Sequence, residues 1–169
     1  MVASFSQDLS QPEYIHVLIN PLPVYGLAIG ILGLIIALIL RSRPAQIATL
    51  ALILVCSAAA WPVAHYGDEA YDRVLSIADD TGDAWLKVHV HRADKLVGFF
   101  YALAVLSAIA IFVPLKWPKS GLILALVTLF FSVLVLGMGG YIAYAGGKIR
   151  HREFRNELPP PVPPDEGGH

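Results

Sequence analysis

The chain has 169 residues, of which 56% are hydrophobic and only 15% are charged, and its net charge is −1. Soluble domains average about 25% charged residues, so the composition argues against one, and 12 Lys and Arg against 13 Asp and Glu provide no basic surface for nucleic acid. The only cysteine, Cys56, excludes a disulfide framework, a cysteine-rich metal site and covalent haem attachment through C-x-x-C-H.

The N-terminal segment, residues 1–20, contains no lysine or arginine, and the first cation of the chain is Arg41. It therefore lacks the basic region of a cleaved signal peptide. We expect this segment to be a tail and the apolar run after it to be retained as a membrane span.

Four stretches contain no Asp, Glu, Lys, Arg or His, and each has at least 20 residues. They are residues 21–40, 44–64, 96–115 and 120–147. A helix rises about 1.5 Å per residue, so roughly 20 residues cross a hydrocarbon core of about 30 Å. Because the backbone must satisfy its own hydrogen bonds in lipid, the sequence predicts an all-α integral membrane bundle of four helices.

The connections between the spans predict the topology. Residues 41–43 and 116–119 are too short for anything but tight turns, which favours an up-down-up-down four-helix bundle with both termini on one face. The membrane domain is then 21–147, with an extramembrane connection at 65–95 and a basic, then proline-rich, tail at 148–169. Both turns are basic and contain no acid, so we expect them in the cytoplasm. Both termini would then lie on the periplasmic side of a bacterial inner membrane. Eight of the twelve lysines and arginines, however, lie on the same side as the termini.

The connection 65–95 combines apolar spacing with turn signals. Tyr71, Val74, Leu75 and Ala78 recur at helical spacing and predict a short amphipathic helix on the membrane interface. Asp83 is the expected N-cap of the helix that leads into the third span. The prolines of 159–164 predict an extended polyproline II segment, and Trp61, Trp85 and Trp117 are expected to be interfacial anchors.

Small residues recur at helix-packing spacing in three of the spans. Two interpretations are open: close packing within the bundle, or a surface at Gly26–Gly33 that admits a cofactor ring or a partner's helix. The residues are Gly26, Gly30, Gly33, Ala104, Ala108, Gly139, Gly140, Gly146 and Gly147.

Every predicted span brings a histidine to the terminal face: His16, His65, His89, His91 and His151. Facing histidines hold b-type haem or a metal in membrane bundles, and Asp68, Glu69, Asp94 and Glu153 could supply oxygen ligands. The alternative is that the histidines merely tolerate the interface. No pair has the H-x-x-x-H spacing of a local metal site, and no histidine lies in the middle of a span.

The order of these residues resembles the bacterial four-helix membrane proteins catalogued as domain of unknown function 2231. The resemblance covers about residues 14–155. It is carried by His16 with Pro23 and Val24 before the first span, Gly67-Asp68-Glu69-Ala70 with Val74 after the second, His91-Arg92-Ala93, and Gly146-Gly147 followed by His151. A second histidine of the opening motif is Pro21 here, and a histidine before the paired glycines is Tyr144.

The resemblance implies the same four-helix architecture, and it nominates His16, His91 and His151 over His65 and His89. It supplies no reaction, but some members look associated with respiratory or cytochrome-containing proteins. The sequence itself contains no G-x-S-x-G, no glycine-rich phosphate loop and no paired carboxylate within a span.

Three functions follow as hypotheses. The first is a non-catalytic subunit in the lipid bilayer that associates with a partner membrane protein, or with itself, in a redox or energy-transducing complex. The second is a small electron carrier that holds haem b through two of His16, His91 and His151. The third is a divalent-metal site that uses the same histidines with Asp68 or Glu69.

Overall fold

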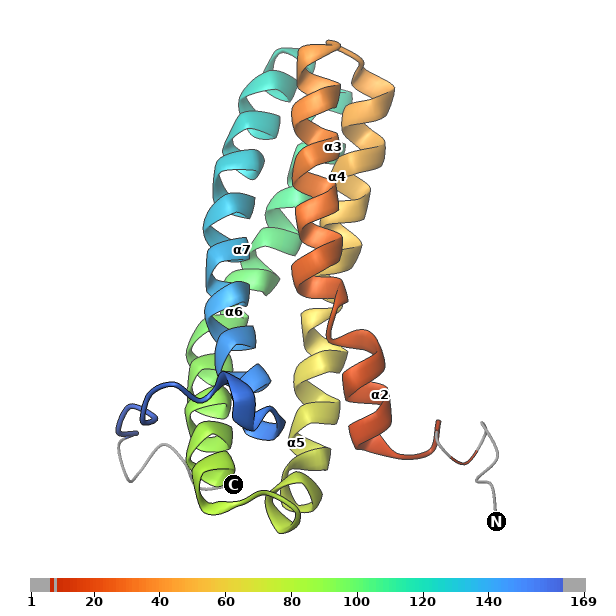
Figure 1. Cartoon of the computed structure of the whole chain (residues 1–169). Coiled ribbons are helices and arrows are strands. Elements are labelled where there is room, and N and C mark those ends of the chain that lie inside the picture. The colour runs from red at the N-terminus through yellow and green to blue at the C-terminus, as the bar shows by residue number, and fades with distance from the viewer. Residues whose placement is uncertain (1–6, 8, 163–169) are drawn as a thin grey trace.

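The computed structural model describes residue 7 and residues 9–162, and every regular element in that part of the chain is helical. Figure 1 shows long helices side by side, with the described ends of the chain together at one end of the molecule. In chain order the elements are α2 (Pro12–Ile19), the π-helical turn η1 (Leu22–Gly26), α3 (Leu27–Ile39), α4 (Arg43–Ala58), α5 (Ala60–Ser76), α6 (Asp80–Lys116), the 3-10 turn η2 (Pro118–Ser120), α7 (Gly121–Arg150) and the 3-10 turn η3 (Arg152–Phe154).

These elements combine into four helices that are long and apolar enough to cross a membrane: Pro12–Ile39, Arg43–Ser76, Asp80–Lys116 and Pro118–Arg150. The prediction of an all-helical chain with four such helices is confirmed. The helices have 28, 34, 37 and 33 residues, well beyond the 20 needed to cross a bilayer. All four therefore extend past the apolar stretches by which they were predicted.

The bundle core consists of apolar side chains from every long helix. Leu27 and Leu34 of α3, Leu50 of α4 and Leu103 of α6 are fully buried, while many other large apolar side chains point outward. An outward apolar surface of this extent is typical of helices that face lipid.

The glycines of α3 let α3 and α4 approach closely. A Cβ at Gly30 would lie 2.7 Å from Ile53 Cγ1, and one at Gly33 would lie 2.7 Å from Thr49 Cγ2. Gly26 faces Cys56 in the same way. The packing interpretation is confirmed for these three glycines, and the alternative of a free surface for a cofactor ring or a partner's helix is wrong, because α4 already occupies it.

Two predictions for the connection 65–95 are wrong. Of the residues expected to form a separate interfacial helix, Tyr71, Val74 and Leu75 belong to α5, which runs on to Ser76, and Ala78 follows it. Tyr71 is buried against its neighbours. The N-cap of α6 is Asp79, whose side chain accepts a hydrogen bond from the Gly82 N–H; Asp83 lies in the first turn. The helices are interrupted only at 77–79, so the connection is mostly an extension of the bundle.

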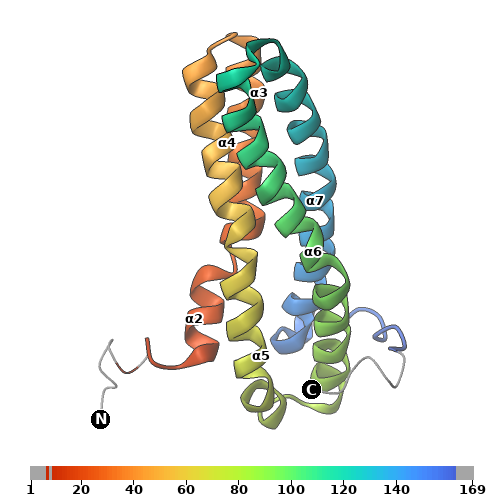
Figure 2. The same cartoon turned by 180° about the vertical axis from the view of Figure 1, so that it is seen from behind.

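The first helix is offset where α2 meets α3. Pro21 and Pro23 flank the start of η1, and proline lacks the N–H of the regular helical bond. Figures 1 and 2 show α2 displaced from the axis of α3 and lying beside α5. This offset opens space between α2 and the lower parts of α6 and α7.

A proline inside α6 leaves a carbonyl without its helical partner. Pro114 cannot donate to the Ala110 oxygen one turn earlier, and Ala110 is completely buried. The Arg43 guanidinium donates to this oxygen from Nη2 at 3.1 Å. An arginine at the start of α4 thus compensates for a proline in α6.

We expect Arg43→Met to destabilise the protein by about 1–3 kcal/mol, the cost of leaving a buried carbonyl unpaired. In a Pro114→Ala background the restored backbone N–H supplies the missing bond, so the same substitution should cost about 1 kcal/mol less. Thermal unfolding in detergent of the two single variants and the double variant measures the difference. Arg41→Met, in the adjacent exposed turn, is the control, and equal losses in both backgrounds would contradict the assignment.

Candidate functional site

A cavity of about 280 Å³ lies between α2, η1 and α5 on one side and α6 and α7 on the other. Its volume is slightly below the range of small-molecule sites, which begins at about 300 Å³. Along α7 it extends from Gly139 at its inner end to Arg150 at its outer end, about 16 Å of helix. Apolar residues such as Val24, Val97 and Phe100 form most of its wall.

Two histidines line this cavity, His16 from α2 and His89 from α6. The Nδ1–H of His16 donates to the Val63 oxygen on α5 at 2.8 Å, and the Nδ1–H of His89 donates to the Ile142 oxygen on α7 at 3.0 Å. The fold therefore brings one histidine of the first helix and one of the third to a common space.

Both histidines are held in the same way, by a helix carbonyl and the glycine four residues after it. The His16 ring lies against Gly67, where a Cβ would be 3.0 Å from Nδ1 and Cε1, and the His89 ring lies against Gly146, where a Cβ would be 3.1 Å from the same atoms. In a helix the Cβ tilts toward the N-terminus and covers the carbonyl of the preceding turn. A glycine leaves that carbonyl open to a second donor, and we call each set a carbonyl–glycine pair: Val63 with Gly67, and Ile142 with Gly146.

The carbonyl partners fix the tautomer of both rings. A carbonyl oxygen only accepts, so Nδ1 must carry the hydrogen in each case. In the neutral imidazole Nε2 then has a free lone pair. Metal-ligating histidines typically have this arrangement, with one nitrogen donating to a carbonyl and the other facing the metal.

The charged residues of the cavity are unevenly distributed. Asp68, which follows Gly67, and Asp94, five residues along α6 from His89, both line it. Arg150, the last residue of α7, is the one lysine or arginine among the residues that line this cavity. The outer end is therefore cationic and the middle is acidic.

The other histidines lie elsewhere. His151 follows α7, is exposed, and donates from Nδ1 to Glu153 at 2.9 Å, while His65 is exposed beside Glu69 at 3.5 Å. His91 is partly buried on α6 and is not among the residues that line the cavity. The expected grouping of His16, His91 and His151 is thus not formed; His16 is joined by His89 instead.

The divalent-metal hypothesis also lacks its ligand set. Of the expected ligands, His16 and Asp68 line the cavity, whereas His91, His151 and Glu69 do not. Within residues 9–162, no group of three His, Cys, Asp or Glu side chains is placed to hold a metal ion. The structure provides two imidazoles in a largely apolar cavity.

A second polar feature, which we call the C-terminal clasp, ties the chain after α7 to the start of α6. Arg155 donates to Asp79 at 2.6 Å and to the Lys148 and Ile149 oxygens at 2.7 Å each, so it pairs with the N-cap of α6 and caps the end of α7. Arg152 adds a second ion pair to Asp79 at 2.8 Å. The Gly82 N–H, followed by the Arg155 guanidinium, holds the pKa of Asp79 below its usual value.

The lowered pKa of Asp79 predicts a pH dependence of stability. A carboxyl whose folded pKa is depressed stabilises the protein above its unfolded pKa, near 3.8, and that stability is lost as the pH falls through the folded pKa. We expect Asp79→Asn to lower the Tm at neutral pH and the difference from wild type to shrink below about pH 4. Asp80→Asn, in the adjacent first turn, is the control for a change of charge alone.

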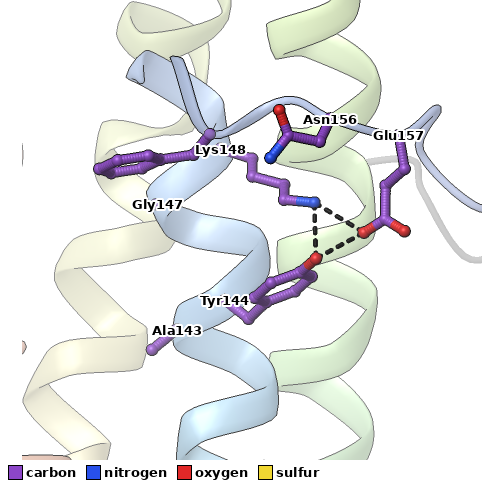
Figure 3. A pocket seen from close by; sticks show the side chains of 7 residues that line it. Ala143, Tyr144, Gly147, Lys148, Asn156 and Glu157 are labelled. Carbon is purple, nitrogen blue, oxygen red and sulfur yellow. Dashed lines mark hydrogen bonds and ion pairs between the residues drawn. The ribbon is translucent and has the colours of Figure 1, made fainter. Parts of the chain in front are cut away.

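The clasp also covers Lys148, which is almost completely buried. Its Nζ donates to Tyr144 Oη and Glu157 Oε1 at 2.7 Å each (Figure 3). It also lies 4.4 Å from the centre of the Trp85 ring. Trp85 is buried under this contact, so its predicted role as an exposed interfacial anchor is wrong, whereas Trp61 and Trp117 are exposed. An adjoining cavity of about 480 Å³ is lined by Lys148 and Glu157 together, and their opposite charges leave no net charge for a ligand.

The tail beyond the clasp contacts the bundle at Val162, while Leu158 is exposed. Residues 158–162 have no regular secondary structure, and Val162 packs against the buried cluster that includes Trp85 and Leu86. The rest of the predicted polyproline segment, 163–164, and most of residues 1–8 lie outside the described residues.

Comparison with family models, with curated proteins and with solved structures finds no match for this chain. The resemblance to domain of unknown function 2231 therefore stays a prediction. The interpretation of the cavity depends on its geometry alone.

Proposed function

We propose that this protein is a small integral membrane haem protein in which the imidazoles of His16 and His89 would hold a b-type haem. The observation that carries the proposal is the pair of imidazoles in one apolar cavity, each fixed through Nδ1 by a carbonyl–glycine pair. This revises the sequence-based choice of ligands, with His89 in place of His91 and His151.

The donor set favours haem over other occupants. Two imidazole nitrogens would suit haem iron, and a largely apolar wall would suit the porphyrin. A divalent metal would need further ligands that the described residues do not bring together. A quinone carbonyl would need a donor, whereas the Nδ1–H of His16 and that of His89 already donate to backbone carbonyls.

The bound haem would supply reversible one-electron chemistry at its iron. The chain contributes the rest. Val63 and Ile142 orient the imidazoles and increase their basicity through the Nδ1 hydrogen bonds, and Phe100, Val97 and Val24 exclude water from the inner end of the cavity. Because both imidazoles are held rigidly, they would move little when the charge on the haem iron changes.

A visible absorption spectrum tests the proposal most directly. Protein purified in mild detergent from cells supplied with haem precursor should show a Soret band and the sharp reduced bands of a six-coordinate, low-spin haem, at one haem per chain. A pyridine haemochrome assay gives the stoichiometry. If neither native protein nor protein reconstituted with haem shows these bands, the proposal is wrong.

We further propose that the four long helices cross a bacterial inner membrane as an up-down-up-down bundle with both termini on the periplasmic side. Support comes from the tight turns at 40–42 and 117–120, which lie at the same end of the molecule in Figure 1, and from the four cations there without a single acid: Arg41, Arg43, Lys116 and Lys119. Alkaline phosphatase fused after residue 169 should be active and a cytoplasmic fluorescent reporter there should be dark. The reverse result would invert the orientation.

An electron carrier of this size needs a redox partner, so the accessory-subunit and haem hypotheses can describe one protein. We propose that it delivers electrons within a membrane redox complex, either to a partner membrane protein or between copies of itself. Copurification of a larger complex from native membranes in mild detergent would support association. A single monodisperse 18.3 kDa species would contradict it.

A further inference from the structure

We infer that Arg150 binds the propionate carboxylates of the haem and thereby fixes which edge of the porphyrin faces the outer end of the cavity. This inference rests on the proposed haem site. It concerns the charged edge of the proposed haem. The histidine nitrogens that would bind the iron do not contact this edge.

The charge distribution of the cavity carries the inference. A b-type haem is amphipathic: one edge has two carboxylates and the opposite edge is apolar. The inner end of the cavity offers Phe100, Val24 and Gly139, and the outer end offers Arg150, the one lysine or arginine among the lining residues. A guanidinium binds carboxylates through paired, charge-assisted hydrogen bonds.

Repulsion acts in the same direction. Asp68 follows Gly67, against which the His16 ring lies, so it belongs to the middle of the cavity and not to the outer end at Arg150. A propionate turned toward Asp68 would meet a like charge in a partly dry space. Attraction at Arg150 and repulsion at Asp68 therefore favour the same orientation.

The position of Arg150 also suits the haem edge that carries the two carboxylates. It is the last residue of α7, it is exposed, and the polar clasp follows directly after it. Carboxylates placed there keep contact with water while the rest of the porphyrin is enclosed, so their desolvation cost is small.

The test compares haem b with its dimethyl ester, which has the same ring and iron but no carboxylates. The full-length protein in detergent is titrated with each, as wild type, Arg150→Gln, Arg150→Lys and Arg152→Gln. Arg152 is the matched control, because it is an exposed arginine two residues away that pairs with Asp79 and does not line the cavity.

We expect Arg150→Gln to weaken binding of haem b about 3- to 10-fold, as for a partly exposed charge pair, and to leave binding of the ester unchanged. Arg150→Lys should retain part of the preference, and Arg152→Gln should match wild type. Unchanged ester binding also shows that the variant is folded. If Arg150→Gln weakens both porphyrins equally, or neither, the inference is wrong; if wild type binds neither, the proposed haem site fails as well.

Discussion

Replacing His89 by alanine should abolish the six-coordinate haem spectrum and weaken haem binding by more than about 100-fold. Loss of an outer-shell partner of a metal ligand typically costs about 10- to 100-fold in metal affinity, and loss of the ligand itself should cost more. His16→Ala should have a smaller effect on retention, because His16 comes from the short α2, in which no residue is fully buried, whereas His89 comes from the 37-residue α6. The measurements are haem content after purification and the reduced spectrum.

The control for this prediction is His91→Ala, two residues along the same helix. Sequence resemblance nominates His91 as a ligand, whereas the structure excludes it from the cavity wall, so the two assignments give opposite results. His151→Ala adds a second control at an exposed position beside Glu153. A normal spectrum in His89→Ala together with a lost spectrum in His91→Ala would overturn the structural assignment.

The four long helices could be predicted because the evidence for them is a simple absence. Four stretches of bilayer length contain no Asp, Glu, Lys, Arg or His, the residues that are most costly to place in lipid. The continuation of α5 and α6 through 65–95 could not be predicted in the same way. Arg73, Asp72 and Lys87 made the connection look extramembrane, yet charged residues on the outer face of a helix are compatible with its extension beyond the membrane.

The choice between His89 and His91 depends on which face of α6 meets α7. Residues two positions apart in a helix point about 200° away from each other, so only one of His89 and His91 can face the cavity. A signal was present in the sequence: His89 shares the spacing of Leu86, Ala93 and Phe100, all of which line the cavity. His91 is off that stripe, and a helical projection of 86–100 would have favoured His89.

The carbonyl–glycine pairs and the C-terminal clasp were beyond sequence analysis for different reasons. Val63 with Gly67 and Ile142 with Gly146 are ordinary apolar spacings until a histidine from another helix is known to approach them. Arg155 and Asp79 are 76 residues apart, and nothing local in the exposed tail indicates their contact. Both features arise from the way helices meet, which only the assembled bundle defines.

Replacing Gly146 by valine should reduce haem occupancy strongly while leaving the bundle folded. A Cβ at this position would lie 3.1 Å from Nδ1 and Cε1 of His89, and the branched side chain would displace the ring from the Ile142 oxygen. Since this hydrogen bond orients the ligand, we expect an affinity loss of about 10- to 100-fold. Gly67→Val should act on His16 through the Val63 oxygen in the same way.

Gly147 offers a matched control one residue away. A Cβ there would meet nothing within 4 Å, so Gly147→Val carries the same change in helix propensity without touching the imidazole. Alanine sharpens the comparison, because Gly147→Ala should raise the Tm slightly through helix propensity, by up to about 1 kcal/mol, whereas at Gly146 the contact with His89 offsets that gain. Both variants should be folded by circular dichroism. If Gly146→Val and Gly147→Val then bind haem equally, the His89 ring does not need the space that Gly146 leaves. The proposal that His89 is a fixed ligand would then be contradicted.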